Sequence, residues 1–165
     1  MSHEANDGST RAAPLRPGDN FATGAVYITE RMRREMVSIG GFTHPLFTRP
    51  GEVSLPQGSP LPGQAVLLLM GGLVEQSGRL TDAIALMGMR EVRFRRPVVP
   101  GDRMHVMVNV IAQSPHSPGR AICDMRWAAV SGTGRTHVEA EIQMLVARSR
   151  MDDADGRDEY CQRNP

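Results

Sequence analysis

His44 is the side chain in this sequence that is most readily put to chemical use. It lies in the segment from Gly41 to Phe47, which reads Gly-Phe-Thr-His-Pro-Leu-Phe. An imidazole titrates near neutral pH and can act as a general base or acid. Its neighbours Phe42 and Phe47 can neither donate nor accept a proton. We therefore treat the segment as a candidate site in which His44 either transfers a proton or shapes the loop.

A helix is expected just before this segment, and the segment itself begins an irregular loop. Thr29 is a helix N-cap, because Glu30 follows in the first turn and a helical stretch runs from Arg31 to Ile39. Two glycines then end that helix. The stretch 42–62 carries five prolines and is predicted to be irregular loop. A loop of this length inside a compact domain is commonly functional.

One strongly apolar helix is predicted from Gln64 to Gly78. It is apolar nearly all round, so it should be buried. Gly71 and Gly72 in its middle each lower helix propensity by roughly 1 kcal/mol relative to alanine. We expect these glycines to allow close backbone approach, either to a sheet or to a ligand.

The remaining regular segments are strands. Phe21–Ile28 alternates well enough for a first strand, and four later segments are rich in β-forming residues. Their order around the apolar helix predicts an α+β domain with an antiparallel sheet around one helix. The four later segments are Ala83–Arg95, Arg103–Gln113, Arg120–Ser131 and Thr136–Ala147.

The length and composition fit one domain with a mainly aliphatic core. The chain has 165 residues, of which 40% are hydrophobic and only 4% aromatic. The ordered domain is expected over residues 16–149. Polar tails at 1–15 and 150–165 cannot offset their ordering entropy by burial, so we expect both to be disordered.

Charge and cysteine content exclude several classes of protein. A formal net charge of +1 gives no electrostatic case for nucleic acid or a membrane surface. Cys123 and Cys161 are far apart and suggest neither a disulfide framework nor a metal site. No apolar stretch approaches the ~20 residues of a membrane span, and the N-terminus lacks a signal-peptide pattern. A cytoplasmic location is expected.

The segment 41–47 resembles a family motif, and so does 92–102, which reads Val-Arg-Phe-Arg-Arg-Pro-Val-Val-Pro-Gly-Asp. Both are similar to the MaoC-like branch of the hotdog superfamily, which contains R-specific enoyl-thioester hydratases and 3-hydroxyacyl dehydratases. The resemblance spans roughly 16–148. It implies a single hotdog fold, in which an antiparallel sheet wraps around a long central helix.

The resemblance also marks a departure at the chemical centre. In the family the first motif typically reads Gly-Asp-x-Asn/His-Pro-Leu/Ile-His, and its Asp and final His act as the acid–base pair on an acyl thioester. Those two positions are Phe42 and Phe47 here, and the residues Thr43–Leu46 between them fix the alignment. His44 corresponds to the Asn or His of the motif. A scaffold without its usual acid–base pair is therefore expected.

Further binding residues are implied by the same resemblance. Pro62, Gly63 and Gln64 match the start of the central helix, whose N–H groups polarise the thioester carbonyl in the family; a plain helix start is the alternative. The arginines Arg93, Arg95 and Arg96 could hold phosphates of coenzyme A or of a pantetheine arm. A solvated charged face explains the same arginines equally well.

The function implied is acyl-thioester binding, with acyl-CoA or acyl carrier protein supplying the substrate and no metal or redox cofactor. One interpretation is a divergent hydratase or dehydratase, for instance in polyketide or other specialised fatty-acyl metabolism. Another is a non-catalytic hotdog subunit or pseudoenzyme that pairs with an active paralogue. A thioesterase is a weaker alternative, because Glu75 lies roughly 18 Å along the helix from Gly63. A homodimer or heterodimer is expected.

Overall fold

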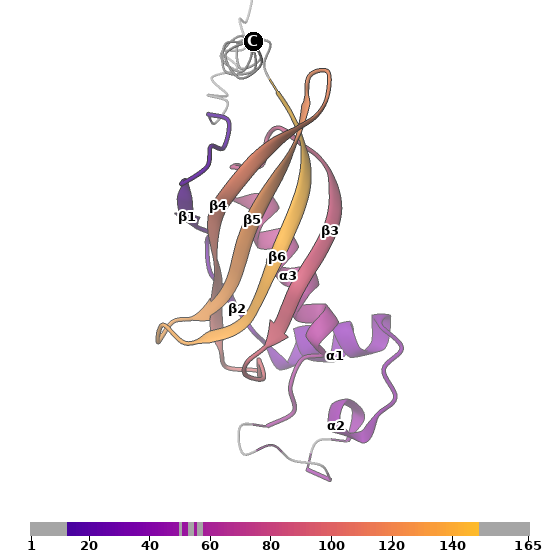
Figure 1. The fold of residues 1–165 in the computed structure, drawn as a ribbon. Coiled ribbons are helices and arrows are strands. Elements are labelled where there is room, and N and C mark those ends of the chain that lie inside the picture. Colours follow the sequence, from indigo (N-terminus) through magenta and orange to yellow (C-terminus); the bar gives the residue numbers. More distant parts are fainter. Residues whose placement is uncertain (1–12, 50, 53–54, 56–57, 149–165) are drawn as a thin grey trace, which may run out of the picture.

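Four long strands form most of one antiparallel sheet (Figure 1). The computed structural model describes residues 13–49, 51–52, 55 and 58–148. Within these residues the sheet order is β1-β4-β5-β6-β3, and β2 also pairs with β4. The strands are β1 (Asn20–Ala22), β2 (Val26–Tyr27), β3 (Ala83–Phe94), β4 (Arg103–Ser117), β5 (Arg120–Ser131) and β6 (Thr136–Ala147).

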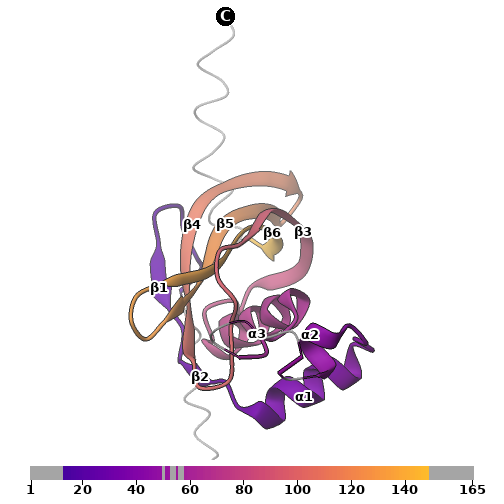
Figure 2. The same cartoon turned by 90° about the horizontal axis from the view of Figure 1, so that it is seen from below.

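The sheet curves around helix α3 (Gly63–Gln76), which lies against its concave face (Figure 2). Buried residues of α3, among them Met70 and Val74, belong to one core cluster with residues of β4, β5 and β6. On β4 the buried side chains Val106, Val108 and Val110 alternate along the strand. Because alternate side chains of a strand face the same side, this pattern directs one face of β4 onto α3.

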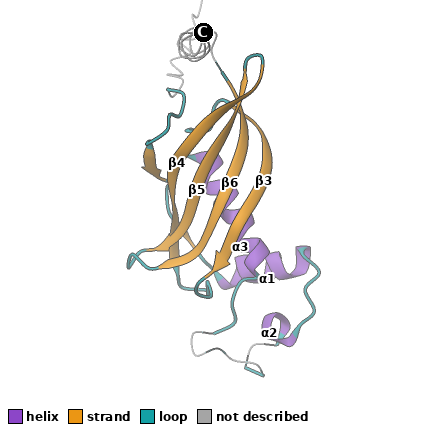
Figure 3. Ribbon diagram, in the orientation of Figure 1, coloured by secondary structure: helices purple, strands orange, loops and turns teal. Residues whose placement is uncertain are grey.

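Two shorter helices lie outside this core, α1 (Glu30–Ile39) and α2 (Pro45–Thr48) (Figure 3). The N-cap of α1 is Thr29, whose hydroxyl accepts the Met32 amide at 3.1 Å. That cap and the bounds of α1 confirm the predicted first helix. The loop expected over 42–62 does contain one regular turn, α2. Proline at its first position is preorganised for a helix, which accounts for the turn.

The strand bounds match the sequence prediction to within one residue except at two places. The expected strand Phe21–Ile28 is divided into β1 and β2, because Thr23 between them is buried and its hydroxyl accepts the Val106 amide at 2.9 Å. Strand β4 continues past Gln113 to Ser117, through Pro115. Proline is tolerated there because the pairing of β1 with β4 reaches only Asn109, so β4 is an edge beyond that point.

The predicted role of the central glycines is wrong as regards the sheet. A Cβ added to Gly71 would meet no heavy atom within 4 Å, and one added to Gly72 would meet only the side chain of Gln76, at 4.0 Å. The helix is also not buried all round, since Leu68 is 65% exposed. One face of α3 is therefore open in the protomer.

Packing of the domain begins with Leu15, just before the start expected at residue 16. Leu15 is 8% exposed, and its carbonyl accepts the Gln113 side-chain amide at 2.7 Å. Residues 1–12 of the first expected tail and all of the second, including Cys161, lie outside the described residues. Among the helices that are described, none is long and apolar enough to cross a membrane.

Candidate functional site

Phe42 is positioned by the end of α1. The Gly41 amide donates to the Ser38 carbonyl at 3.1 Å and the Phe42 amide donates to the Val37 carbonyl at 3.0 Å. This pair of bonds is a Schellman motif, which requires a left-handed residue after the helix. Gly41 supplies it, with φ of +65°. The motif turns the chain back at once and places Phe42 beside the helix end.

Phe47 is positioned by α2. His44 is the N-cap of this helix, and its Nδ1 accepts the Leu46 amide at 3.2 Å. The single ring proton of an imidazole that accepts in this way lies on Nε2. The sequence offered His44 as a proton-transfer group or a loop-shaping residue, and this contact gives it a loop-shaping role. Whether it also transfers a proton stays a prediction.

The two phenylalanines contact each other. Their ring centroids are 5.4 Å apart in an edge-to-face arrangement, and the His44 ring lies 6.3 Å from that of Phe47. Such aromatic pairs contribute beyond their buried area. A Cβ at Gly40 would overlap the Phe42 ring, so glycine at this position makes room for the pair.

Arg33 of α1 holds this segment in place. Its side chain is only 3% exposed and donates to the Phe47 carbonyl at 2.6 Å. The same guanidinium contacts both carboxylate oxygens of Glu30, at 2.7 and 2.9 Å. The hydrogen bond from Arg33 lowers the pKa of Glu30 and raises the pKa of Arg33. The nearly buried guanidinium of Arg33 thus binds the candidate segment to α1.

Replacing Arg33 by Ala should reduce the free energy of unfolding by about 2 kcal/mol, since a hydrogen bond to a charged group contributes roughly 1.5–3 kcal/mol. The contribution of Glu30 is discounted because its side chain is 48% exposed. Urea unfolding of the two proteins measures the difference. An unchanged unfolding midpoint would contradict the anchoring role.

Arg31→Ala is the matched control, because the Arg31–Glu35 pair is exposed on both sides and should contribute little to stability. The pH dependence gives a second check. The pKa of Glu30 is lowered from its ordinary value of 4.5, so its pairing stabilises the fold above that pH. The contribution is lost as the pH falls through the lower pKa of the folded protein, and Arg33→Ala should then differ less from wild type.

The start of α3 presents unpaired backbone donors. Its N-cap is Pro62, which offers no side-chain acceptor, and the Pro62 carbonyl accepts the amides of Ala65 and Val66. In the part of the chain that the structure describes, no hydrogen bond is found from the amides of Gly63 and Gln64. These N–H groups lie at the positive end of the helix dipole and are suited to a carbonyl oxygen that gains negative charge.

Phe94, the last residue of β3, covers Gly63. A Cβ at Gly63 would lie 2.7 Å from the nearest carbon of the Phe94 ring, so only glycine fits without moving that ring. Gly63 was predicted as a site residue from the sequence, whereas Phe94 was not. The signal was its alternation with Arg93 and Arg95, which directs Phe94 to the face of the sheet opposite the charges.

The structure therefore forms two groups from the predicted site residues. Phe42, Phe47 and His44 lie together, and Gly63 lies against Phe94. No ring contact between the two groups is found within the described ranges. The arrangement can offer two amide donors and several apolar rings. It offers no carboxylate at position 42 or imidazole at position 47.

The predicted phosphate-binding arginines each have a different partner. Arg93 pairs with Glu91 at 2.6 Å, and Arg95 pairs with Glu139 at 3.0 Å. Arg96 instead donates to the Thr136 carbonyl at 3.0 Å. Arg93 and Arg95 are therefore neutralised by neighbouring carboxylates. This arrangement fits the alternative of a solvated charged face. Phosphate binding by this cluster stays a prediction.

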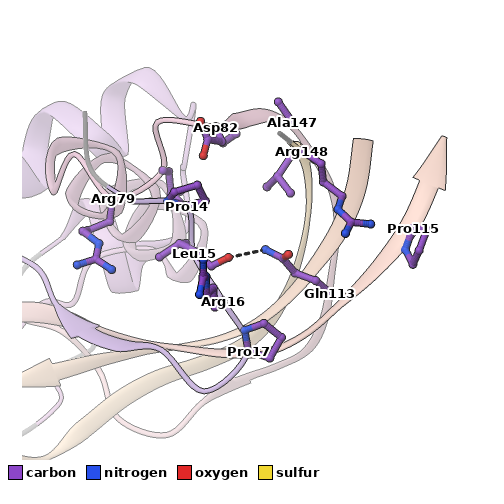
Figure 4. Close-up of a pocket in the computed structure, with 13 residues that line it drawn as sticks. Pro14, Leu15, Arg16, Pro17, Arg79, Asp82, Gln113, Pro115, Ala147 and Arg148 are labelled. Atoms are coloured by element: carbon purple, nitrogen blue, oxygen red, sulfur yellow. Dashed lines mark hydrogen bonds between the residues drawn. The ribbon is translucent and has the colours of Figure 1, made fainter. Parts of the chain in front are cut away.

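Three cavities, of about 450, 300 and 480 Å³, lie on other parts of the described chain, and none is lined by the candidate residues at 42, 44, 47 or 63. Figure 4 shows the first, which lies between residues 14–17, the chain after α3 and the ends of β4 and β6. Its walls include Pro14 and Arg148, near both ends of the described chain. Because Arg79 and Leu80, just after α3, also line this cavity, it adjoins the end of α3 opposite to Gly63.

Comparison with known proteins identifies the fold. No protein-family sequence model matches the chain, and no curated protein sequence matches it. Solved structures do match. A monoamine oxidase regulatory protein from Archaeoglobus has a TM-score of 0.75 at 19% identity, over 82% of this chain and 92% of that one. A MaoC-like dehydratase from Rhodospirillum rubrum has a TM-score of 0.71 at 24% identity, over 82% and 94%.

A third match is the HadBC complex, a 3R-hydroxyacyl-ACP dehydratase from Mycobacterium tuberculosis, with a TM-score of 0.64 at 18% identity over 78% of this chain and 96% of that one. The chain therefore has the hotdog fold. Within that fold, the structures it matches include those of MaoC-like dehydratases, as the two sequence motifs predicted.

Proposed function

We propose that this protein binds acyl thioesters, of coenzyme A or of an acyl carrier protein, as a divergent member of the hydratase and dehydratase type. The observation that carries the proposal is the start of α3. The amides of Gly63 and Gln64 have no acceptor among the described residues, and the apolar ring of Phe94 lies against Gly63. A thioester carbonyl would accept from these amides while its acyl chain contacts the apolar side chains.

The usual proton transfers have no donor or acceptor at the two family positions. Addition of water to a 2-enoyl thioester needs a group that takes a proton from water and one that delivers a proton to Cα. Phe42 and Phe47 fill the two positions with a packed pair of rings. We infer that the protein binds and polarises a thioester far better than it hydrates one.

Calorimetric measurement of butyryl-CoA binding tests the proposal. Gly63→Pro removes one amide donor, and Pro is tolerated at the first position of a helix. Gly63→Ala is the matched control, because it also displaces the Phe94 ring but keeps the N–H. We expect wild type to bind and the Pro variant to bind about fivefold more weakly than the Ala variant, the usual contribution of one hydrogen bond. A wild-type protein that does not bind would contradict the proposal.

A second hotdog chain is the proposed partner. Strand β3 ends the sheet order, so its outer edge is unpaired in the protomer. Leu86, Met89 and Phe94 lie opposite buried residues of β6, which places them on the α3 side, yet they are 38–54% exposed. Leu68 on the open face of α3 is exposed as well. An apolar edge and an open helix face together fit a second chain, either an identical copy or a paralogue.

The unpaired edge of β3 supports a second candidate function. In this alternative the protein is a non-catalytic subunit that pairs with another hotdog chain. A chain that lacks its own acid–base pair would bind the thioester beside a paralogue that keeps Asp and His. HadBC, which shares the fold, was solved as a complex. Activity of the isolated protein against activity of its mixture with such a paralogue separates the two candidates.

Light scattering at micromolar concentration should give the mass of a dimer. Introducing charge at the edge, with Leu86→Lys and Met89→Lys together, should shift the protein to a monomer, because two like charges would face their copies across the interface. Ile39→Lys is the control, since Ile39 is 83% exposed on α1 and its substitution should leave the mass unchanged. A wild-type monomer would contradict the proposed partner.

A further inference from the structure

A groove of about 480 Å³ lies where the sheet meets the loop between β3 and β4. One wall is that loop, and the other is the turn between β5 and β6. Every residue that lines the groove lies in the described part of the chain. They include Arg96, Pro97, Val99, Arg103, Thr133 and Arg135.

The groove gathers three arginines that form no ion pair with a described residue. Most arginines of the described chain form ion pairs, whereas Arg96, Arg103 and Arg135 form none with any described residue. The groove contains one acid, Asp102, and its carboxylate accepts the Val99 amide at 2.9 Å. Arg96 donates only to a backbone carbonyl, that of Thr136. The lining therefore holds three arginines and a single carboxylate, which already accepts a backbone amide of the loop.

The remaining walls add hydrogen-bonding groups without adding negative charge. The hydroxyls of Ser131 and Thr133 lie 2.9 Å apart in the turn. His137 is buried, and its Nδ1 lies 3.0 Å from the Pro97 carbonyl. Since a carbonyl oxygen only accepts, Nδ1 carries the proton in this contact. A groove with these donors suits a phosphate group, which guanidinium forks bind through paired hydrogen bonds.

The groove adjoins the start of α3 through one short segment. Phe94 contacts Gly63, and Arg96, two residues later, lines the groove. Val98 accepts the Leu61 amide at 2.8 Å, two residues before Gly63, while its neighbours Pro97 and Val99 line the groove. The same segment thus has the amide donors of α3 on one side and the arginine groove on the other.

We propose that this groove binds the phosphate of the thioester's carrier group, the phosphopantetheine arm of coenzyme A or of a carrier protein. The inference rests on the proposed function, because it takes the thioester carbonyl to lie at Gly63. The arm would pass the exposed ring of Phe94 and place its phosphate at Arg103 and Arg135. These residues replace Arg93 and Arg95, which are neutralised by their glutamates.

Binding of three butyryl thioesters tests the inference: butyryl-CoA, butyryl-phosphopantetheine and butyryl-N-acetylcysteamine, which has no phosphate. In the variant with Arg103→Gln and Arg135→Gln, the dissociation constant for butyryl-CoA should rise about tenfold, since two charge-assisted contacts are lost. That for the N-acetylcysteamine thioester should not change. Arg120→Gln is the matched control. Arg120 is another arginine without an ion pair among the described residues, and it lies at the other end of β5.

The outcomes separate this inference from the proposed function. An equal loss for butyryl-phosphopantetheine assigns the groove to the phosphate shared by both carriers and supports the inference. A loss for butyryl-CoA alone would assign the groove to the nucleotide phosphates and overturn the proposed pantetheine-phosphate site. Unchanged binding of butyryl-CoA by the double variant would overturn it and leave thioester binding intact. An equal loss for the phosphate-free thioester would also overturn it. If wild type bound none of the three, the proposed function would fail as well.

Discussion

Replacing Phe42 by Asp and Phe47 by His in one protein should raise the rate of crotonyl-CoA hydration at least about 100-fold, because a general acid or base typically contributes 10²–10⁴-fold. The two ring centroids are only 5.4 Å apart, so the new carboxylate and imidazole would start close together. The amide donors at Gly63 need no change. The measurement is the hydration rate of the folded double variant against wild type.

The matched control for this gain is Phe42→Asn with Phe47→Gln. It introduces side chains of similar polarity that cannot exchange protons at neutral pH. Both double variants should lose several kcal/mol of stability, since two packed rings are removed and polar groups are partly buried. An equal rise in both would trace the gain to polarity and not to proton transfer. A folded Asp/His variant that binds butyryl-CoA without any gain would show that the site serves different chemistry, and the hydratase interpretation should be dropped.

The wild-type protein, purified alone, should hydrate crotonyl-CoA at less than about 1% of the rate of a hydratase that keeps both groups, since each missing group removes at least two orders of magnitude. The structure leaves His44 as the titratable side chain of the segment, and its Nδ1 caps α2. Steady-state hydration assays on the isolated protein measure this rate directly.

Two substitutions at His44 separate its possible roles if activity is found. Asn can also accept an amide at an N-cap, so His44→Asn keeps the cap but removes the imidazole. His44→Ala removes both. Activity lost in both variants would assign proton transfer to His44 and contradict the expected inactivity, whereas activity lost only in the Ala variant would assign it to the shape of the loop.

Local signals in the sequence were enough to predict the regular elements. Thr29 with Glu30 predicted the start of α1, and the apolar run after Pro62 predicted α3 to within two residues. The β-forming residues of β3, β4, β5 and β6 predicted the long strands. These features depend on residues close in sequence, and capping or alternation carries that information.

Contacts between distant segments could not be predicted in the same way. Arg33 and Phe47 are joined by a side-chain bond to a backbone carbonyl, which leaves no trace in composition. The available signal was the spacing of Arg33 to the buried Val37, one helical turn away on the same face. The contact of Phe94 with Gly63 depends on how the end of β3 is placed relative to the start of α3. Likewise, the open space at Gly71 follows from how α3 lies against the sheet.

A crystal structure with butyryl-CoA bound would test the central claim most directly. The thioester carbonyl oxygen should lie within about 3.2 Å of the Gly63 or Gln64 amide. The Phe42 and Phe47 rings should lie near the acyl Cα and Cβ, with no carboxylate or imidazole within about 3.5 Å of either carbon. A carbonyl bound away from the start of α3, or a titratable side chain in reach of both carbons, would contradict it.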